Sequence, residues 1–332
     1  MLKQKLMSSL FLPFLFTGGL ICQAKAVDEG LDEYTLDTIV VTAQRTETRD
    51  LDTPATTTVI TAKDIENRGY LSVFDALDQT VGITSYNNSS GQGDNGSSTG
   101  RTYIRGLDKG TLILVNGAPV NLNNYNSPAG IPISAVERIE IVRGPAAAVY
   151  GSDAIAGAVQ IFTRRAAREG FAPYAGVGAG SRGLWKADAG FAVKNGAADY
   201  ALGASHEQAK GYSVRTGGNP DRDGWRNTNA SASAGYQLND QHRLQASALW
   251  GRMKAQYDDF TSSPANWADD WGDNRVQTLA GTWAAQWSRA WRTTATLSHA
   301  GQRYETRPSP YLNTTRQRTA QLHSEWREGP HL

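Results

Sequence analysis

Apolar and polar side chains alternate along most of the chain after residue 170, and this period of two constrains the fold more than any other feature. It is clear in "WKADAGFAVK" (185–194), "NASASAGYQL" (229–238) and "RLQASALW" (243–250). Successive side chains of a strand point to opposite faces, so each segment predicts a strand with one apolar face. We expect roughly eight such strands, each near the ~10 residues of a tilted transmembrane strand.

The predicted connections alternate in length. Long loops follow the third, fifth and seventh strands, and the short turns "NDQH" (239–242) and "SRA" (288–290) follow the fourth and sixth. Outer-membrane barrels have short periplasmic turns, long outer loops and aromatic girdles, and nine tryptophans suit such girdles. A soluble β-sandwich also alternates, but it would not explain loops that are long at one end only.

The amino terminus has the pattern of a secretory signal. Lys3 and Lys5 precede the apolar run "LFLPFLFTGGLI" and then "AKA". The run is shorter than the ~20 residues of a membrane-spanning helix, so we predict a cleaved signal over 1–26 rather than an anchor. Cys22, the only cysteine, leaves with it, and Ile21 before it disfavours a lipoprotein signal. The mature chain therefore has no disulfide or thiolate metal site.

Two short helices are predicted after residue 60. Thr61 can cap the first, with Asp64 in its first turn and Gly69 at its end. Ser72 and Asp75 repeat the start of this pattern in "LSVFDALDQTVG".

Strands are predicted next. Residues 112–115 form a short buried strand that turns at Asn116-Gly117 into a second strand. Ser134 and Glu137 predict a capping box, followed by a strand that includes residues 139–141. This part of the chain is a compact domain of mixed α and β structure.

Several motifs resemble those of TonB-dependent outer-membrane receptors. They are "DTIVVTA" (37–43), "YIRG" (103–106), "LILVNGAPV" (112–120) and "VERIEIVRGPAAAVYGSDAIAGAVQIFT" (136–163). The resemblance implies an α+β plug domain followed by the first part of an antiparallel barrel in a Gram-negative outer membrane, with import of a scarce large nutrient. The expected divisions are a signal peptide (1–26), a flexible segment (27–50), a plug (51–165) and a partial barrel (166–332).

The heptad at 37–43 resembles the TonB box. Family members offer this segment in extended form to a sheet edge of TonB, their partner protein, through main-chain hydrogen bonds. The implied coupling residues are Asp37, Thr38, Ile39, Val40, Val41, Thr42 and Ala43. The alternative is that the heptad is a strand of the plug sheet itself.

Ligand contacts in this family come from outward plug loops. The two candidate loops here supply Tyr86, Asn87, Asn88, Gln92, Asn124, Tyr125 and Asn126. They contain almost no cationic residues, whereas an anionic ferric catecholate would favour arginine or lysine. Neutral hydrogen-bonding groups suit cobalamin, and a ferric siderophore is the alternative ligand.

The later acidic loops resemble those of the vitamin B12 receptor branch, in which loop aspartates bind calcium. Carried over to this chain, the ligands are Asp221 and Asp223 in one loop and Asp258 and Asp259 in the next. Carboxylates suit Ca²⁺, which takes six to eight oxygens. The alternative is an acidic, solvated loop, and no other cofactor is expected.

Four charged plug residues are expected to lie inside the barrel. Arg105, Glu137, Glu140 and Arg143 would have to pair with each other or with the barrel wall to offset desolvation. We interpret them as structural or gating residues.

Other functional classes have little support. A net charge of +1 does not favour nucleic acid as a partner, and the five histidines lack metal-ligand spacing. The "GSDAIAG" stretch matches neither a phosphate-binding loop nor a nucleophile elbow. A barrel enzyme or a purely structural outer-membrane protein remains a less favoured alternative.

Eight strands cannot enclose a plug of this size, because eight-stranded barrels are filled by their own side chains. The sequence also ends at "EWREGPHL", without a terminal aromatic strand. We therefore expect the chain to be a fragment, a truncated frame or half of a split receptor.

Overall fold

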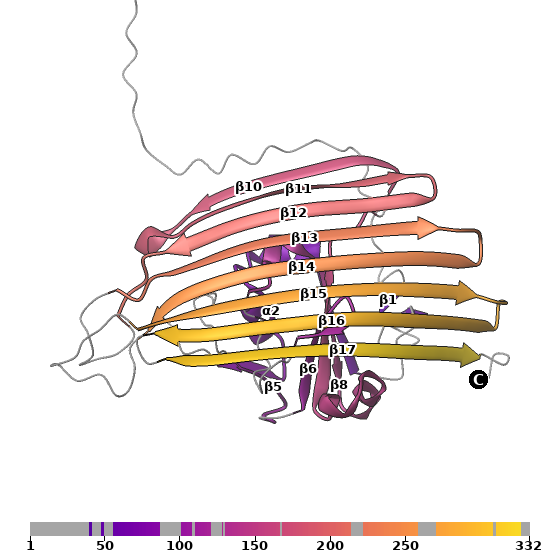
Figure 1. The fold of residues 1–332 in the computed structure, drawn as a ribbon, viewed down its shortest axis with the longest axis horizontal. Helices are drawn as coiled ribbons and strands as arrows, with labels where there is room; N and C mark the ends of the chain where they lie inside the picture. The colour runs from indigo at the N-terminus through magenta and orange to yellow at the C-terminus, as the bar shows by residue number, and fades with distance from the viewer. Residues whose placement is uncertain are drawn as a thin grey trace, which may run out of the picture.

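The computed structural model describes residues 40–41, 48–49, 56–86, 101–107, 110–120, 128, 130–166, 168–213, 222–257, 270–307 and 310–326. A small mixed domain lies behind a large curved antiparallel sheet (Figure 1). The predicted signal peptide and most of the predicted flexible segment lie outside the described residues. No helix among the described residues is long and apolar enough to cross a membrane.

Helix α1 (Ala62–Arg68) begins with the predicted cap. The Asp64 amide donates to Thr61 Oγ1 at 3.1 Å, and the Thr61 amide donates to Asp64 Oδ2 at 2.9 Å. The helix ends at Gly69, whose φ of 66° is a left-handed conformation that glycine adopts without strain. The prediction for this helix is confirmed.

Helix α2 (Val73–Asp78) also begins where predicted. Ser72 Oγ accepts a hydrogen bond from the Asp75 amide at 3.0 Å. Phe74 and Leu77 are fully buried, so α2 supplies apolar side chains to the interior.

Five strands form the plug sheet, in the order β3-β8-β9-β6-β7. They are β3 (Thr56–Thr61), β6 (Thr111–Val115), β7 (Ala118–Pro119), β8 (Val136–Arg143) and β9 (Gly157–Thr163). Only the β6–β9 pair among these is parallel. A separate hairpin joins β4 (Ile83–Tyr86) to β5 (Arg101–Ile104).

The plug sheet has apolar side chains on both faces. Ile139 and Ile141 of β8 join the larger core, and Val142 joins a smaller cluster on the opposite face. Short 3-10 turns complete the plug: η4 (Ile133–Ala135), η5 (Pro145–Tyr150) and η6 (Ser152–Ala154). The predicted turn at Asn116-Gly117 is confirmed, with both residues at positive φ.

The predicted capping box at Ser134 and Glu137 is wrong. Ser134 lies inside η4, which has no side-chain cap, and Glu137 is already the second residue of β8. The run "VERIEIV" pairs with β3 on one side and β9 on the other. Sheet pairing therefore overrides the local helix signal.

Eight strands form the large sheet, in sequence order and antiparallel throughout. They are β10 (Gly170–Ala179), β11 (Trp185–Asn195), β12 (Ala198–Ala209), β13 (Trp225–Gln237), β14 (His242–Tyr257), β15 (Asp270–Gln286), β16 (Trp291–Arg307) and β17 (Tyr311–Trp326), with η7 (Ser181–Gly183) between the first two. The predicted strand number is confirmed. In the described part of the chain the edge strands β10 and β17 do not pair with each other, so the sheet is an open part of a barrel wall.

One prediction about the connections is wrong. Strands β16 and β17 are joined by residues 308–310 alone, where a long loop was expected. Their pairing continues through polar residues as far as Thr306 opposite Tyr311. Because the ladder needs backbone groups rather than apolar side chains, the alternation signal underestimates its length. Strand β15 likewise begins at Asp270, inside the predicted acidic loop.

Aromatic side chains gather at the end of the sheet with short turns. The Trp287 ring lies 5.2 Å from His242 and 5.6 Å from Trp291, and Trp291 lies 5.9 Å from Trp326. Trp283 is 5.9 Å from Trp287. This row is the aromatic girdle expected at one membrane interface.

The plug packs against the concave face of the sheet. Leu249 of β14 and Val276 of β15 belong to the plug core, and Met253 packs against Phe74 of α2. At Gly251 the wall has no side chain, and a Cβ there would lie 2.5 Å from the Gly130 carbonyl oxygen of the plug. The glycine therefore permits direct backbone approach between plug and wall.

Candidate functional site at the plug and barrel wall

Of the predicted TonB box at 37–43, the structure describes only Val40 and Val41. Strand β1 (Val40–Val41) pairs with β2 (Thr48–Arg49) in a two-stranded sheet separate from the plug sheet. The other predicted box residues, 37–39 and 42–43, lie outside the described residues. The alternative of a plug-sheet strand does not match this pairing.

The predicted ligand-binding residues are described only at Tyr86. Its backbone ends β4 and pairs with Arg101 of β5, so residues 87–100 link the two strands of a hairpin. The other six predicted contacts, at 87, 88, 92 and 124–126, lie outside the described residues.

Among the predicted calcium ligands, only Asp223 lies in the described part. It precedes β13 and is 2% exposed, and its amide donates to the Tyr212 carbonyl at 3.4 Å. Asp221, Asp258 and Asp259 lie outside the described residues. No group of three or more potential metal ligands occurs within the described ranges.

Two of the predicted gating residues meet around an arginine that sequence reasoning missed. Arg138 Nε donates to Glu140 Oε1 at 2.7 Å, and Arg138 Nη1 donates to Glu137 Oε1 at 3.0 Å. Arg165 contacts the same Glu137 oxygen at 3.6 Å, and the Arg138 guanidinium stacks over Phe162. Glu140 is fully buried, so this pairing offsets the desolvation of its charge. The Glu-Arg-Ile-Glu spacing on one strand was the available signal.

The other two predicted gating residues lie elsewhere. Arg143 Nη1 donates to Thr58 Oγ1 at 2.8 Å, and its Nη2 donates to the Val81 carbonyl at 3.0 Å. Burial and the nearby Arg105 lower the pKa of Arg143. Both arginines line a cavity of about 550 Å³. The four residues thus form two groups, and Arg143 links β3 to the turn after α2.

A second cavity lies between the plug sheet and the barrel wall. It has a volume of about 170 Å³ and is lined by Arg138, Gln160 and Arg165 of the plug. The wall contributes Asp199, which pairs with Arg243 across β13. Gly235 lies between them, and a Cβ there would collide with both side chains.

Asn116 fixes the plug turn that reaches this cavity. Its Nδ2 donates to Thr163 Oγ1 at 2.8 Å, and its Oδ1 accepts from the Thr163 amide at 3.1 Å. The turn is thereby tied to the end of β9.

The linker from plug to barrel also contacts the wall. The Arg164 guanidinium lies over the Tyr174 ring at 4.8 Å, and the Arg164 carbonyl accepts from Ser233 Oγ at 3.2 Å. The Tyr174 side chain extends across Gly190 and Gly203 of the next two strands. Charged and polar groups thus add to the apolar contacts of Leu249 and Val276 between plug and wall.

Comparisons with known proteins agree with this architecture. Residues 49–158 match the family model described as TonB-dependent Receptor Plug Domain, beside the predicted plug at 51–165. The chain is 32% identical over 232 residues to the Vitamin B12 transporter BtuB of Vibrio vulnificus, covering 68% of this chain and 36% of the relative. It is 29% identical over 238 residues to that of Photobacterium profundum, covering 70% and 38%. The chain thus spans under two fifths of these relatives' length.

Solved structures share the fold. The ferric enterobactin receptor PfeA of Pseudomonas aeruginosa superposes with a TM-score of 0.64 at 22% identity, over 86% of this chain and 47% of that one. The alcaligin receptor FauA of Bordetella pertussis gives 0.65 at 18% identity, over 85% and 45%. With its plug domain and open barrel wall, the chain belongs to the TonB-dependent receptors of the Gram-negative outer membrane.

Proposed function

We propose that this chain provides the plug and part of the wall of a receptor that captures a scarce nutrient and imports it through TonB. The observation that supports this most is the plug seated on the concave face of the barrel wall. Leu249 and Val276 anchor it through apolar contacts, while Arg138, Gln160 and Arg165 face a polar cavity beside the wall. Such an interface is stable at rest and can be rearranged by force.

Coupling to TonB is proposed to use residues 37–43. Val40 and Val41 are extended, as strand addition requires, and they pair only with a two-residue strand among the described residues. If a strand edge of TonB took the place of Thr48–Arg49, the short β1–β2 pairing would be replaced by a longer ladder of hydrogen bonds.

Cobalamin is the proposed nutrient. The curated relatives at 29–32% identity carry the name vitamin B12 transporter, and the candidate plug loops are rich in neutral amides and hydroxyls. The solved siderophore receptors support the fold alone at their level of identity. A ferric siderophore remains the second candidate.

Ligand identity is testable in outer membranes from cells that express this gene and from a matched deletion strain. Gene-dependent binding of radiolabelled cyanocobalamin, displaced by unlabelled cyanocobalamin and not by ferric enterobactin, would support the proposal. Displacement by the ferric siderophore alone would identify the second candidate, a ferric siderophore, as the ligand. A loss of cyanocobalamin binding on calcium chelation would support the proposed aspartate site.

A proline at Val40 tests coupling separately from binding. Proline lacks the amide hydrogen that a β-ladder needs, so Val40→Pro is expected to keep cyanocobalamin binding and to abolish uptake. Val40→Thr keeps a β-branched residue with its amide, and its uptake should match the unmodified protein. Normal uptake by the proline variant would refute the coupling role.

A further inference from the structure

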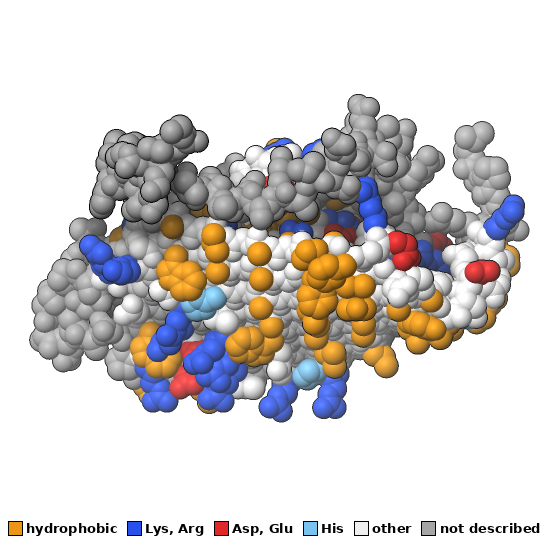
Figure 2. Space-filling view, turned by 90° about the horizontal axis from the view of Figure 1, so that it is seen from above, with side chains coloured by type: hydrophobic (Ala, Val, Ile, Leu, Met, Phe, Trp, Pro, Cys, Tyr) orange, Lys and Arg blue, Asp and Glu red, His pale blue; other side chains and the backbone are white. Residues whose placement is uncertain are grey.

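A strongly basic surface lies on the outward face of the barrel wall. Leu249 and Val276 face the plug, so residues one position away on each strand face outward. The strand register adds these described residues to that face: Arg252, Lys254, Arg275, Arg303, Arg307, Arg316 and Arg318, with Asp273 and Glu305. We call this set the outer basic surface. Basic and acidic side chains gather toward the left of the face in Figure 2.

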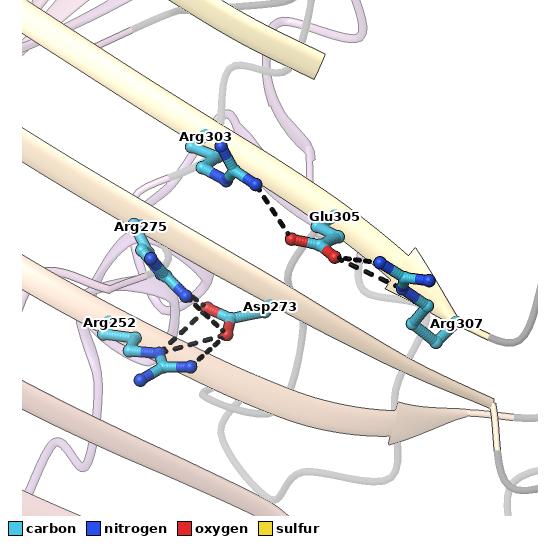
Figure 3. A network of polar contacts seen from close by, with 6 residues as sticks. All are labelled: Arg252, Asp273, Arg275, Arg303, Glu305 and Arg307. Atoms are coloured by element: carbon cyan, nitrogen blue, oxygen red, sulfur yellow. Dashed lines mark hydrogen bonds and ion pairs between the residues drawn. The ribbon is translucent and has the colours of Figure 1, made fainter. Parts of the chain in front are cut away.

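The two acidic residues are already shared among arginines (Figure 3). Asp273 accepts from Arg252 Nε at 3.0 Å and from Arg275 Nη2 at 3.3 Å. Glu305 accepts from Arg303 at 3.2 Å and from Arg307 at 2.9 Å. Two carboxylates thus serve four guanidinium groups, and the surface keeps an excess of positive charge.

Crowded and unpaired basic groups remain on this surface among the described residues. Arg275 lies directly opposite Arg303 in the ladder, an arrangement of like charges that is unfavourable unless an anion lies between them. Arg316 and Arg318 are exposed and form no ion pair within the described ranges. The excess positive charge of this surface therefore favours binding of an external anion.

A hollow occurs where these charges converge. It has a volume of about 310 Å³, and its lining includes Trp250, Arg275, Gln277, Arg303 and Arg316. Gly301 also lines it, and the atoms nearest to a Cβ at that position belong to the flexible Gln277 side chain. Arginine presents donors in a planar fork that matches the oxygens of phosphate.

The surface lies at the depth of lipid headgroups. Along β16 the rise from Trp291 in the girdle to Arg303 is about 30 Å normal to the membrane, at ~3.3 Å per residue and a tilt of ~40°. That distance slightly exceeds the ~25 Å apolar band of such barrels. Between them, Leu279 and Leu297 are 57% and 67% exposed and face the hydrocarbon region. Arg303 thus lies above the acyl chains, and Arg316, which is opposite Gly301 in the ladder, lies at their upper edge, both toward the end of the barrel with the long loops.

We propose that this hollow binds the phosphorylated headgroup of a lipid in the outer leaflet. The guanidinium groups of Arg275, Arg303 and Arg316 bind the phosphate oxygens, and the acyl chains lie along the apolar band below. The bound lipid neutralises the facing arginines and fixes the orientation of this wall in the membrane.

Native mass spectrometry of the full chain, purified in mild detergent, tests the proposal. The probes are diphosphoryl lipid A, phosphatidylcholine and inorganic pyrophosphate. Arg303→Gln with Arg316→Gln should weaken lipid A retention at least tenfold. Gly301→Leu should have a similar effect by filling the hollow without changing the charge.

The matched control is Arg168→Gln with Arg289→Gln, which removes the same charge from exposed positions at the opposite end of the wall. It should retain lipid A fully. Equal retention by the Arg303/Arg316 variant, equal loss in the control, or equal binding of phosphatidylcholine would overturn the proposal. Displacement of lipid A by equimolar pyrophosphate would show a phosphate site that does not select lipid, which also contradicts it.

Discussion

At the scale of single residues, the plug is stabilised by side chains that bind free backbone amides or pair with buried charges. The pair at Thr61 and Asp64 satisfies the free amides at the start of α1. Arg138 compensates the charge of Glu140, which is fully buried. The first is readable from the sequence because the contact is local. The second requires the sheet, which buries Glu140 and brings Arg165 to Glu137.

Removal of the cap should loosen α1 alone. Thr61→Ala is expected to destabilise the helix by about 0.5–2 kcal/mol, since an amide of the first turn loses its acceptor. Hydrogen exchange of the first-turn amides should become about 2- to 30-fold faster. Thr61→Ser keeps the hydroxyl and should exchange at the original rate. Unchanged exchange in the alanine variant would show that packing alone holds the helix.

Removal of the buried carboxylate should have a larger effect. Glu140→Ala leaves Arg138 short of a partner in a site where Arg138 is only 14% exposed, and breaking such a pair costs about 3–5 kcal/mol. Amides of β8 that exchange through this opening should then exchange about a hundredfold to several thousandfold faster. Glu66→Ala removes an exposed carboxylate from α1 and should leave β8 unaffected. Equal exchange in the two variants would contradict the proposed role of the pair.

At the scale of elements, the period of two predicted the eight strands, because each strand separates an apolar outer face from a polar inner one. It failed where pairing continued beyond the apolar band, as at Thr306 opposite Tyr311. The capping signal at Ser134 failed because β8 is held between two strands. The candidate loops at 87–100 and 121–127 carry no periodic pattern, so the sequence identified their composition and not their geometry.

Glycines on the inner face of the wall should be needed for its aromatic packing. A Cβ on Gly203 would lie 2.3 Å from Tyr174 Oη, so Gly203→Ala is expected to displace this ring and destabilise the wall by about 1–3 kcal/mol. Gly281→Ala, on the outer face of β15, is the control, because nothing lies within 4 Å of the Cβ it would add. The resistance of each variant to urea extraction from outer membranes measures the difference. Equal resistance would show that Tyr174 moves at no cost.

At the scale of the whole molecule, the fold consists of two parts, the barrel wall and the plug, with different surfaces. The wall presents an apolar face to lipid and a polar face to the plug, and the plug presents cavities and charged networks to the wall. Their contact is close enough at Gly251 and Gly130 for backbone to meet backbone. Sequence motifs indicated both bodies, but this contact joins residues more than a hundred positions apart and follows only from the tertiary arrangement.

The seating of the plug can be tested at this contact. Gly251→Val would place side-chain atoms against the Gly130 carbonyl and Asn229 Oδ1, 2.5 and 2.7 Å from the new Cβ, so the plug must move away from the wall. We expect a plug more accessible to protease added to permeabilised outer membranes, with the wall still inserted. Gly281→Val adds the same side chain to the next strand with open space around it, and it should leave the plug protected. Equal protection in both variants would mean that the plug is held elsewhere, and the apolar contacts of Leu249 and Val276 with the plug core would then be the anchor to examine.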